Sequence, residues 1–405
     1  MSTAEPTPVA SQSESYACPK CAGKMNFDAA KGTLLCPFCG HTMAVPQAAA
    51  QQGPTPRATI SEHDLEAALK DASGKAQGYG TQLKSIKCQS CGAVLNVEPN
   101  ITSTQCSFCG SNQVLEQQVD PNLYRPESLL PFAIDDVRSN NLFRDWLGRG
   151  LFTPNDLKRE GGGQKLRGVY LPFWTFDAHA ESDWRAESGD YYYETEWVTV
   201  TRDGKQVQEQ QQVQKTRWYW TSGHHRGDYD DVLVYATRSI PTNILQKIYP
   251  YDTSQLVAYQ PQYLSGWSAE SYQVPLAEAW PIGRDIIHTE ETRACDSEVP
   301  GDTHRSLSVE SQLSALTFKH VLLPVWVASY RYHGKTFRFM INGQTGRVDG
   351  EKPISWIKVT IAVVLAIIII GILLYLFSKG KSSNVGEILL WREWAMVQLN
   401  GPLML

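Results

Sequence analysis

The sequence predicts a multidomain protein with two small four-cysteine zinc ribbons, an α+β domain with an antiparallel β-sheet, and one transmembrane helix. Three observations predict this fold class. Eight of the nine cysteines fall into four Cys-x-x-Cys pairs. The 12 Trp and 18 Tyr residues favour an aromatic-rich β domain. The stretch from Val359 to Phe377 carries no charged residue and is long enough to span a bilayer as a helix.

The composition of the whole chain narrows the class of protein further. Its 405 residues provide for two or three folded units. With 42% hydrophobic and 20% charged residues, the chain is ordinary for a globular protein, which excludes fibrous and fully disordered classes. A net charge of −5 argues against a dedicated nucleic-acid surface, because such surfaces need clustered Lys and Arg.

The cysteine spacing is the sharpest signal in the sequence. In each of two sets, two Cys-x-x-Cys pairs are separated by 14 residues, and the second set follows the first with a period of 70 residues. Each pair can form a knuckle that presents two thiolates, and two knuckles complete a tetrahedral site with no open position for catalysis. We therefore predict two structural zinc ions, held by Cys18, Cys21, Cys36 and Cys39, and by Cys88, Cys91, Cys106 and Cys109.

Small residues follow the second cysteine of every knuckle. Gly40, Gly92 and Gly110 occupy this place in three knuckles, and glycine tolerates the positive φ that a tight knuckle requires. Ala22 occupies it in the first knuckle, with Gly23 one position later.

Disulfide bonds and redox catalysis are the alternatives for these cysteines. A secreted protein needs a signal peptide, but residues 1–15 are polar and contain no apolar segment. A thioredoxin-like role fits poorly with pairs that come as matched doublets. The cysteines therefore indicate a reducing compartment, the cytosol.

Changes in composition divide the chain into eight segments. We expect a disordered leader (1–15), zinc ribbon 1 (16–45), a linker with a short helix (46–84), zinc ribbon 2 (85–118), a helical segment (119–165), an aromatic-rich α+β domain (166–353), a transmembrane helix (354–378) and a short tail (379–405).

Two helices are predicted between and around the strands of the α+β domain. Apolar residues recur at helical spacing over Asp135–Gly148 and indicate core packing. Pro275–Asp296 is a second helix, in which Pro281 is expected to cause a break or a kink.

A hairpin is predicted where Tyr191–Thr201 and Gln206–Trp220 flank Arg202-Asp203-Gly204-Lys205. Its second arm is polar on both faces, so we expect it to protrude or to lie at an edge. The aromatic runs Tyr191–Tyr193 and Trp218–Trp220 fit stacking on bases or carbohydrate, but their place on neighbouring strands favours packing on a sheet face.

A short internal repeat indicates two related halves in the β region. Leu171-Pro172-Phe173-Trp174 resembles Leu323-Pro324-Val325-Trp326, and an extended run with spaced aromatics follows each segment.

Few other motifs suggest chemistry. Gly334-Lys335-Thr336 lacks the upstream glycine of a P-loop, since Ser329 stands there. His224 and His225 lie near Asp228, Asp230 and Asp231, which fits either a loop metal site or a solvated polar turn, and we favour the turn. Cys295 lies near Arg293, which would lower its pKa, but an ordinary helix cysteine is the simpler interpretation.

Four segments and the ribbons resemble a known family. The segments are Gly168–Ala178 (GVYLPFWTFDA), Asp230–Val234 (DDVLV), Phe318–Trp326 (FKHVLLPVW) and Asn342–Gly350 (NGQTGRVDG). Over about residues 85–378 the chain resembles a bacterial family of double zinc-ribbon, single-pass membrane proteins. Its members carry labels such as primosomal protein N-prime, superfamily II helicase-like or TFIIB-type zinc ribbon. Because the chain lacks a P-loop, we do not carry over the helicase activity.

The resemblance also implies a function. Some similar bacterial proteins accompany phage-shock and membrane-stress systems, where they place cytosolic stress proteins at the membrane. We therefore expect a non-enzymatic adaptor that recruits protein partners at the membrane and contacts the lipid bilayer. We identify no small-molecule substrate. A nucleic-acid-associated factor and an enzyme with an unrecognised site in the β domain are the alternatives.

Topology follows from the cysteines more than from the charges. The basic residues that flank the apolar segment are nearly balanced between its two sides. Thiolate ribbons need reduced thiols, so we expect the N-terminal region in the cytosol, one span of the inner (plasma) membrane, and the tail outside.

Overall fold

The structure is a computed structural model that describes residues 16–28, 31–45, 60–70, 84–97, 105–117, 123–157, 166–202 and 205–376. The expected leader and tail, most of the 46–84 linker and the Asp203-Gly204 turn lie outside these residues. The chain divides into two compact units. Unit 1 is Met1–Leu142, Gln164–Tyr330 and Arg338–Gly350, and unit 2 is Phe143–Gly163, Arg331–Phe337 and Glu351–Leu405.

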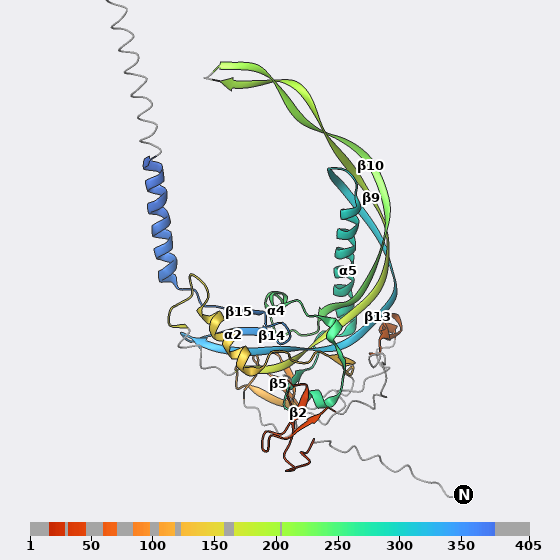
Figure 1. Ribbon diagram of the computed structural model, residues 1–405, viewed down its shortest axis with the longest axis vertical. Helices are drawn as coiled ribbons and strands as arrows, with labels where there is room; N and C mark the ends of the chain where they lie inside the picture. Colours follow the sequence, from red (N-terminus) through yellow and green to blue (C-terminus); the bar gives the residue numbers. More distant parts are fainter. Residues whose placement is uncertain are drawn as a thin grey trace, which may run out of the picture. The chain divides into compact units, whose positions relative to one another are not determined.

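Strands dominate unit 1, and Figure 1 shows their arrangement. The strands are β1 (Asn26–Asp28), β2 (Thr33–Leu35), β3 (Thr42–Ala44), β4 (His63–Asp64), β5 (Lys84–Cys88), β6 (Val94–Val97), β7 (Val114–Gln117), β8 (Ser128–Leu129), β9 (Arg167–Arg202), β10 (Lys205–Tyr235), β11 (Val257–Ala258), β12 (Ser268–Glu270), β13 (Thr303–Tyr332), β14 (Lys335–Asn342) and β15 (Val348–Gly350). The helices are α1 (Leu65–Lys70), α2 (Asp136–Gly148), α4 (Thr242–Ile248), α5 (Leu276–Glu298), the short 3-10 helices η1 (Thr253–Gln255) and η2 (Pro261–Leu264), and an apolar helix, Trp356–Leu376.

The large sheet is mixed, so the prediction of an antiparallel sheet is wrong in this respect. Its main path runs β11-β8-β13-β9-β12-β6-β5-β7, and β10, β14, β15 and β4 pair outside this path. Most neighbours are antiparallel, but β12 is parallel to β9 and β8 is parallel to β13. These two strands are only two or three residues long, which is too short for alternation of apolar and polar residues to reveal them.

The two similar segments, Leu171–Trp174 and Leu323–Trp326, lie side by side at the centre of this sheet. Leu171 of β9 pairs directly with Leu323 of β13 in an antiparallel register. The carbonyl of Pro172 accepts a hydrogen bond from Ala236 N–H, and that of Pro324 accepts one from Gly343 N–H. The parallel strands β12 and β8 flank the pair at matching positions on either side. This arrangement agrees with two related halves that meet at Leu171 and Leu323.

The predicted hairpin is confirmed but is much longer than expected. β9 has 36 residues and β10 has 31, and they pair antiparallel from Lys205 opposite Arg202 to Tyr235 opposite Phe173. Helix α5 packs against both strands, and Figure 1 shows the hairpin continuing past the end of α5. α5 continues from Leu276 to Glu298 through Pro281, so the expected break at the proline is wrong.

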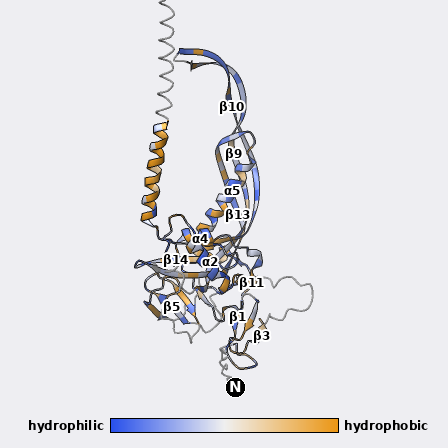
Figure 2. Ribbon diagram, turned by 60° about the vertical axis from the view of Figure 1, so that its left-hand side comes forward, coloured by the Kyte–Doolittle hydropathy of each residue, from blue (hydrophilic) through white to orange (hydrophobic). Residues whose placement is uncertain are grey.

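The apolar helix Trp356–Leu376 belongs to unit 2. It has 21 residues, is apolar enough to cross a membrane, and none of its apolar window is buried within the protein. Figure 2 shows hydrophobic residues along its whole length, whereas β10 is coloured mostly hydrophilic.

Candidate metal centres

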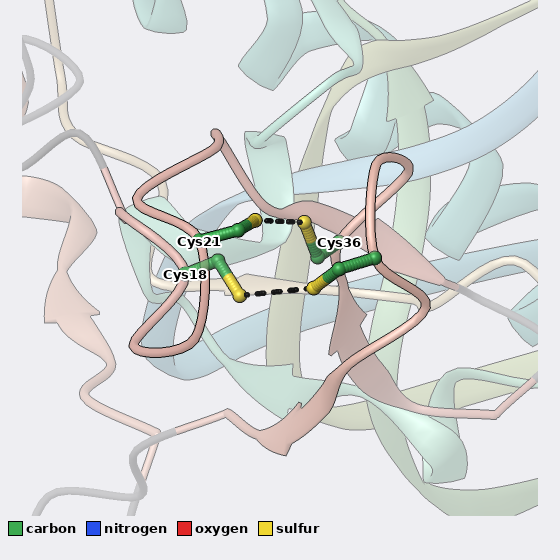
Figure 3. A group of neighbouring side chains, drawn as sticks. Cys18, Cys21 and Cys36 are labelled. Atoms are coloured by element: carbon green, nitrogen blue, oxygen red, sulfur yellow. Dashed lines mark hydrogen bonds between the residues drawn. The ribbon is translucent and has the colours of Figure 1, made fainter.

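The four cysteines of ribbon 1 converge on one point. The Sγ atoms of Cys18 and Cys39 lie 3.5 Å apart, as do those of Cys21 and Cys36 (Figure 3). All four sulfur atoms lie within 4.8 Å of one another. Sulfur atoms at tetrahedral corners about 2.3 Å from a metal are about 3.8 Å apart, whereas a disulfide bond is about 2.0 Å long. The group therefore fits one tetrahedral metal ion rather than two disulfides.

The cysteines of ribbon 2 form a second group with the same geometry. The Sγ distances are 3.5 Å between Cys88 and Cys109 and 3.7 Å between Cys91 and Cys106. Again all four sulfur atoms lie within 4.8 Å of one another. The structure thus brings all eight predicted cysteines together in the two predicted sets, and each set can hold one metal ion.

All four knuckles are closed by the same pair of backbone hydrogen bonds. The N–H of the first cysteine donates to the carbonyl five residues later, at 2.7–2.8 Å, from Cys18, Cys36, Cys88 and Cys106 to Gly23, His41, Ala93 and Ser111. The N–H of the fourth residue after that cysteine donates back to its carbonyl, at 2.8–3.0 Å. This fourth residue is left-handed in every knuckle, with φ of 55° at Ala22, 70° at Gly40, 79° at Gly92 and 70° at Gly110. The predicted positive φ is confirmed, and Ala22 adopts it at a steric cost that glycine avoids.

The backbone also favours the thiolate form at the third cysteine of each set. Burial raises the pKa of Cys36, but hydrogen bonds from the backbone N–H groups of Cys39 and Phe38 outweigh it, and the pKa falls to about 7. At Cys106, the hydrogen bond with Cys91 and the backbone N–H groups of the same knuckle lower the pKa to about 5, against the effect of burial. The pKa values of their partners Cys21 and Cys91 are raised by the same sulfur–sulfur hydrogen bonds, because each pair shares a proton. The contribution of the fold is therefore the backbone N–H groups of the second knuckle, which favour a thiolate at Cys36 and Cys106.

Ribbon 1 has a small core of its own. Strands β1, β2 and β3 form a separate three-stranded sheet, and the core consists of Cys18, Met25, Phe27, Leu34, Cys36 and Val45. Tyr263 and Trp267 from the loop around η2 pack against this core, and Ser265 Oγ donates to the Met25 carbonyl at 2.7 Å. Phe27 N–H donates to the Ser265 carbonyl at 3.0 Å, and Trp267 Nε1 donates to the Phe27 carbonyl at 3.0 Å. The metal group is therefore a large part of what can hold this module together.

Ribbon 2 is part of the large sheet instead. Its strand β6 pairs with β12, where Asn96 lies opposite Ala269. Asn96 also donates to Ser271 Oγ at 2.8 Å and accepts from Ser85 Oγ at 2.6 Å, and all three side chains are buried. Cys88 and Cys106 belong to the same apolar core as the central residues of β9 and β13. The second metal group therefore supports the main core directly.

Asp177, Asp230 and Asp231 form a third group of potential ligands. Asp177 is more than 50 residues from the other two in the sequence, so no local motif reveals the group. The buried Lys319 Nζ lies 2.8 Å from Asp231 Oδ1 and 3.8 Å from Asp177 Oδ2. Burial alone would lower the pKa of Lys319, but the hydrogen bond and charge of Asp231, with the charge of Asp177, raise it above its usual value. The group holds its own cation, an ammonium, and is an ion-pair network.

The histidines near these aspartates do not form a site with them. His224 and His225 lie within strand β10, so the expected polar turn is wrong. Neighbouring residues in a strand face opposite sides, and each histidine has a separate acidic partner: Asp183 at 2.9 Å for His224 and Glu298 at 2.7 Å for His225. The structure brings neither of them into a group of three or more ligands among its described residues.

Cys295 is a buried core residue of α5. It packs with Trp184 and Ala186 of β9. Burial, with the charges of Glu291 and Glu298, raises its pKa to about 11. The alternative of a thiol activated by Arg293 is therefore wrong, and the ordinary helix residue is the correct interpretation.

The aromatic runs of the hairpin are offset from one another rather than paired. Tyr192 lies opposite Lys215 and Trp218 opposite Gly189. Trp218 and Trp220 are covered by guanidinium groups, with Arg305 4.1 Å and Arg185 4.5 Å from the ring centroids. The expected packing on a sheet face is therefore only partial, since Trp220 remains 56% exposed.

Comparison with known proteins gives one informative similarity. The chain is 30% identical over 357 residues to the uncharacterized protein YdjG of Bacillus subtilis (strain 168), and the match covers 85% of this chain and 92% of that protein. No protein-family model matches the sequence. No solved structure matches it either.

Proposed function

The chain belongs to the family of the Bacillus subtilis protein YdjG, and from its own architecture we propose that it is a membrane-anchored adaptor without enzymatic activity. In this proposal the two cysteine groups bind structural zinc, the apolar helix spans the plasma membrane once, and the long hairpin recruits protein partners from the cytosol. The relative YdjG is itself uncharacterized, and the residues of this chain support the proposal.

The outer part of the hairpin is the observation that carries the proposal. We call Asp190–Arg202 of β9 and Lys205–Arg217 of β10 the arm. Strand β13 pairs with β9 only as far as Thr303 opposite Gly189, so among the described residues the arm consists of two strands with both edges unpaired. At about 3.3 Å per residue, it extends about 40 Å beyond this last supporting pair. An isolated two-stranded ribbon is marginally stable in water, and unpaired strand edges readily accept another chain.

The two faces of the arm differ in chemistry. Directly paired residues share a face, and one face carries only uncharged side chains: Tyr193, Thr195, Trp197, Thr199 and Thr201 lie opposite Gln214, Gln212, Gln210, Gln208 and Gln206. Charged residues lie on the other face, among them Glu194, Glu196 and Glu209. Trp197 and Tyr193 are 65% and 62% exposed. Exposed Trp and Tyr within an uncharged, amide-rich surface are typical of protein contact sites.

The cysteine groups support a structural role. Four thiolates fill all positions around zinc, so no position is left for a substrate or an activated water. Soft sulfur ligands in tetrahedral geometry favour zinc over harder metals such as magnesium or calcium. Reduced thiols fit the cytosol, which agrees with the proposed position of the N-terminal region.

Zinc ribbons also occur in nucleic-acid-binding proteins, but the charges of these two ribbons do not favour that role. With its zinc and four thiolates, ribbon 1 is formally neutral and ribbon 2 is negative. Nucleic-acid affinity comes largely from Lys and Arg that neutralise phosphates, and neither metal-bound ribbon has a net positive charge.

A crosslinking pulldown from membranes tests the proposal. The comparison is between the intact chain and a variant in which Glu194–Val213 is replaced by Asn-Gly. Tyr193 and Gln214, which would flank the new turn, are directly paired, so a two-residue turn can close the shortened hairpin. We expect protein partners that survive nuclease treatment and are lost with the arm. Partners that disappear after nuclease treatment would instead indicate a nucleic-acid-associated factor.

A further inference from the structure

The loop that follows α2 carries two apolar side chains at its tip. Thr153 N–H donates to the Gly150 carbonyl at 3.3 Å, which closes a turn with Leu151 and Phe152 at its two central positions. Leu151 is 79% exposed and Phe152 is 39% exposed. Central turn positions are usually polar, Gly or Pro, so two large apolar residues there are anomalous for a turn that faces water.

This turn is held in one conformation. Thr153 is buried, and its Oγ1 donates to the Arg149 carbonyl at 2.8 Å. Gly150 has a φ of 112°, and a Cβ atom at this position would lie 2.6 Å from Thr153 Oγ1. The exposed tip is therefore a defined feature of the fold.

The same turn is bonded to the first residues of the apolar helix. Ser355 N–H donates to the Phe152 carbonyl at 2.8 Å, and Lys358 Nζ donates to the Thr153 carbonyl at 2.7 Å. All these residues belong to unit 2. Helix residues Trp356 and Ile357 are 76% and 75% exposed at the same junction. The tip thus lies beside the end of the helix, where Trp and Lys are typical of a membrane interface.

Lys352 bonds the other side of the loop to the segment that leads into the helix. Lys352 Nζ donates to the carbonyls of Trp146, in the last turn of α2, and of Arg149, the latter at 2.7 Å. It also lies 4.1 Å from the centroid of the Trp146 ring. Arg149 is exposed next to the turn. A basic residue beside an apolar tip suits a surface with apolar chains beneath anionic headgroups.

We infer that the Gly150–Thr153 turn is a second membrane contact, which inserts Leu151 and Phe152 into the lipid interface next to the spanning helix. This inference rests on the proposed membrane span. A single inserted helix is free to rotate and tilt, whereas the helix and a rigid turn together fix the orientation of unit 2 on the bilayer.

Photocrosslinking of the full chain in vesicles of phosphatidylcholine and phosphatidylglycerol tests the inference. A benzophenone amino acid is placed at one position at a time as Leu151→p-benzoylphenylalanine, with Leu365 in the helix as the positive control and exposed Asn155 in the same loop as the negative control. After irradiation, lipid adducts are measured by mass spectrometry. We expect adducts at 151 and 365, at about tenfold the level at 155, because only the first two positions meet acyl chains.

The controls separate this inference from the proposed membrane span. Adducts at 365 with only the level of 155 at 151 would overturn the inference and leave the span intact. An absence of lipid adducts at 365 would overturn the span, and the inference with it. Covalent dimers formed from position 151, without lipid adducts, would show that a second copy of the chain covers the tip instead.

Discussion

Ala22 provides a sensitive test of the knuckle geometry. It occupies the position at which the other three knuckles have glycine, and it is exposed, with a φ of 55°. The left-handed conformation costs a residue with a Cβ about 1–2 kcal/mol. Glycine at this position would remove that cost. It would also give the unfolded chain more conformational freedom, which opposes folding by about 0.4–1 kcal/mol. Ala22→Gly should therefore stabilise folded ribbon 1 by about 0.5–1 kcal/mol, the difference between these two terms.

Gly40 is the matched control, because it holds the same position in the other knuckle of ribbon 1. Its φ is 70°, and no atom lies within 4 Å of an added Cβ. An added Cβ would therefore change only the conformational free energy of the backbone and would cause no clash. Gly40→Ala should destabilise the ribbon by a similar amount. Metal binding is coupled to folding of so small a module, so each change should alter the zinc affinity of ribbon 1 by about two- to fivefold, in opposite directions.

The assay is competition for zinc between the protein and a chromophoric chelator. We expect Ala22→Gly to hold zinc more tightly than the unchanged chain and Gly40→Ala to hold it less tightly, with the double variant near the unchanged value. Equal shifts in the same direction, or no shift in either variant, would refute the assignment of the left-handed residue as a strained position.

Four further predictions concern the two cysteine groups, a buried glutamate, the apolar helix and the C-terminal tail. Cys18→Ser should remove the zinc of ribbon 1 and leave the large sheet folded. Cys88→Ser should lower the unfolding free energy of the large sheet by about 4 kcal/mol or more. Equal effects of the two variants in calorimetry would contradict the difference between the ribbons. Glu270 of β12 is fully buried, and its Oε1 accepts a hydrogen bond from Gln273 Nε2 at 3.0 Å. Burial raises its pKa from the ordinary value of 4.5 to about 7. The protein should therefore become less stable as the pH rises from about 4.5 to about 7, and Glu270→Gln should remove this slope from denaturant titrations; a difference between the two proteins that does not change with pH would argue against it. Deletion of residues 354–377 should move the chain to the soluble fraction of lysed cells, and retention on membranes would indicate another anchor. A reporter that is active only outside the cytosol should work when fused after Leu405; activity of a cytosolic reporter there would contradict a single span.

The cysteine groups were predictable because their signal is local. A knuckle needs only two cysteines and a small residue within five positions, and the two sets of four follow from the spacing of Cys18–Cys39 and Cys88–Cys109. The spacing does not show how each ribbon packs against the rest of the fold. Ribbon 2 joins the sheet because Asn96 pairs with Ala269, more than 170 residues later, and no local pattern shows that pairing.

The hairpin illustrates a different limit. The pairing of its two strands around Asp203-Gly204 was predicted, but the segment after Trp220, which contains His224 and His225, was interpreted as a polar turn. In the structure it is strand, and several of its polar residues meet partners across the hairpin or on α5, such as Asp183 for His224, Glu298 for His225 and Glu181 for Arg226. The same limit applies to Lys319, whose buried charge is balanced by Asp231 and Asp177 from other strands. Side chains that satisfy one another across a sheet look like surface residues when they are read along the sequence.

The most direct test of the proposed function is the location of a partner in living cells. Once crosslinking has identified a protein that binds through the arm, its amounts in the membrane and soluble fractions are compared between cells with the intact chain and cells in which Glu194–Val213 is replaced by Asn-Gly. The proposal predicts that the partner moves from the membrane to the soluble fraction in the second strain, while the shortened chain itself stays on the membrane. A partner that remains on the membrane to the same extent in both strains would contradict recruitment by this protein.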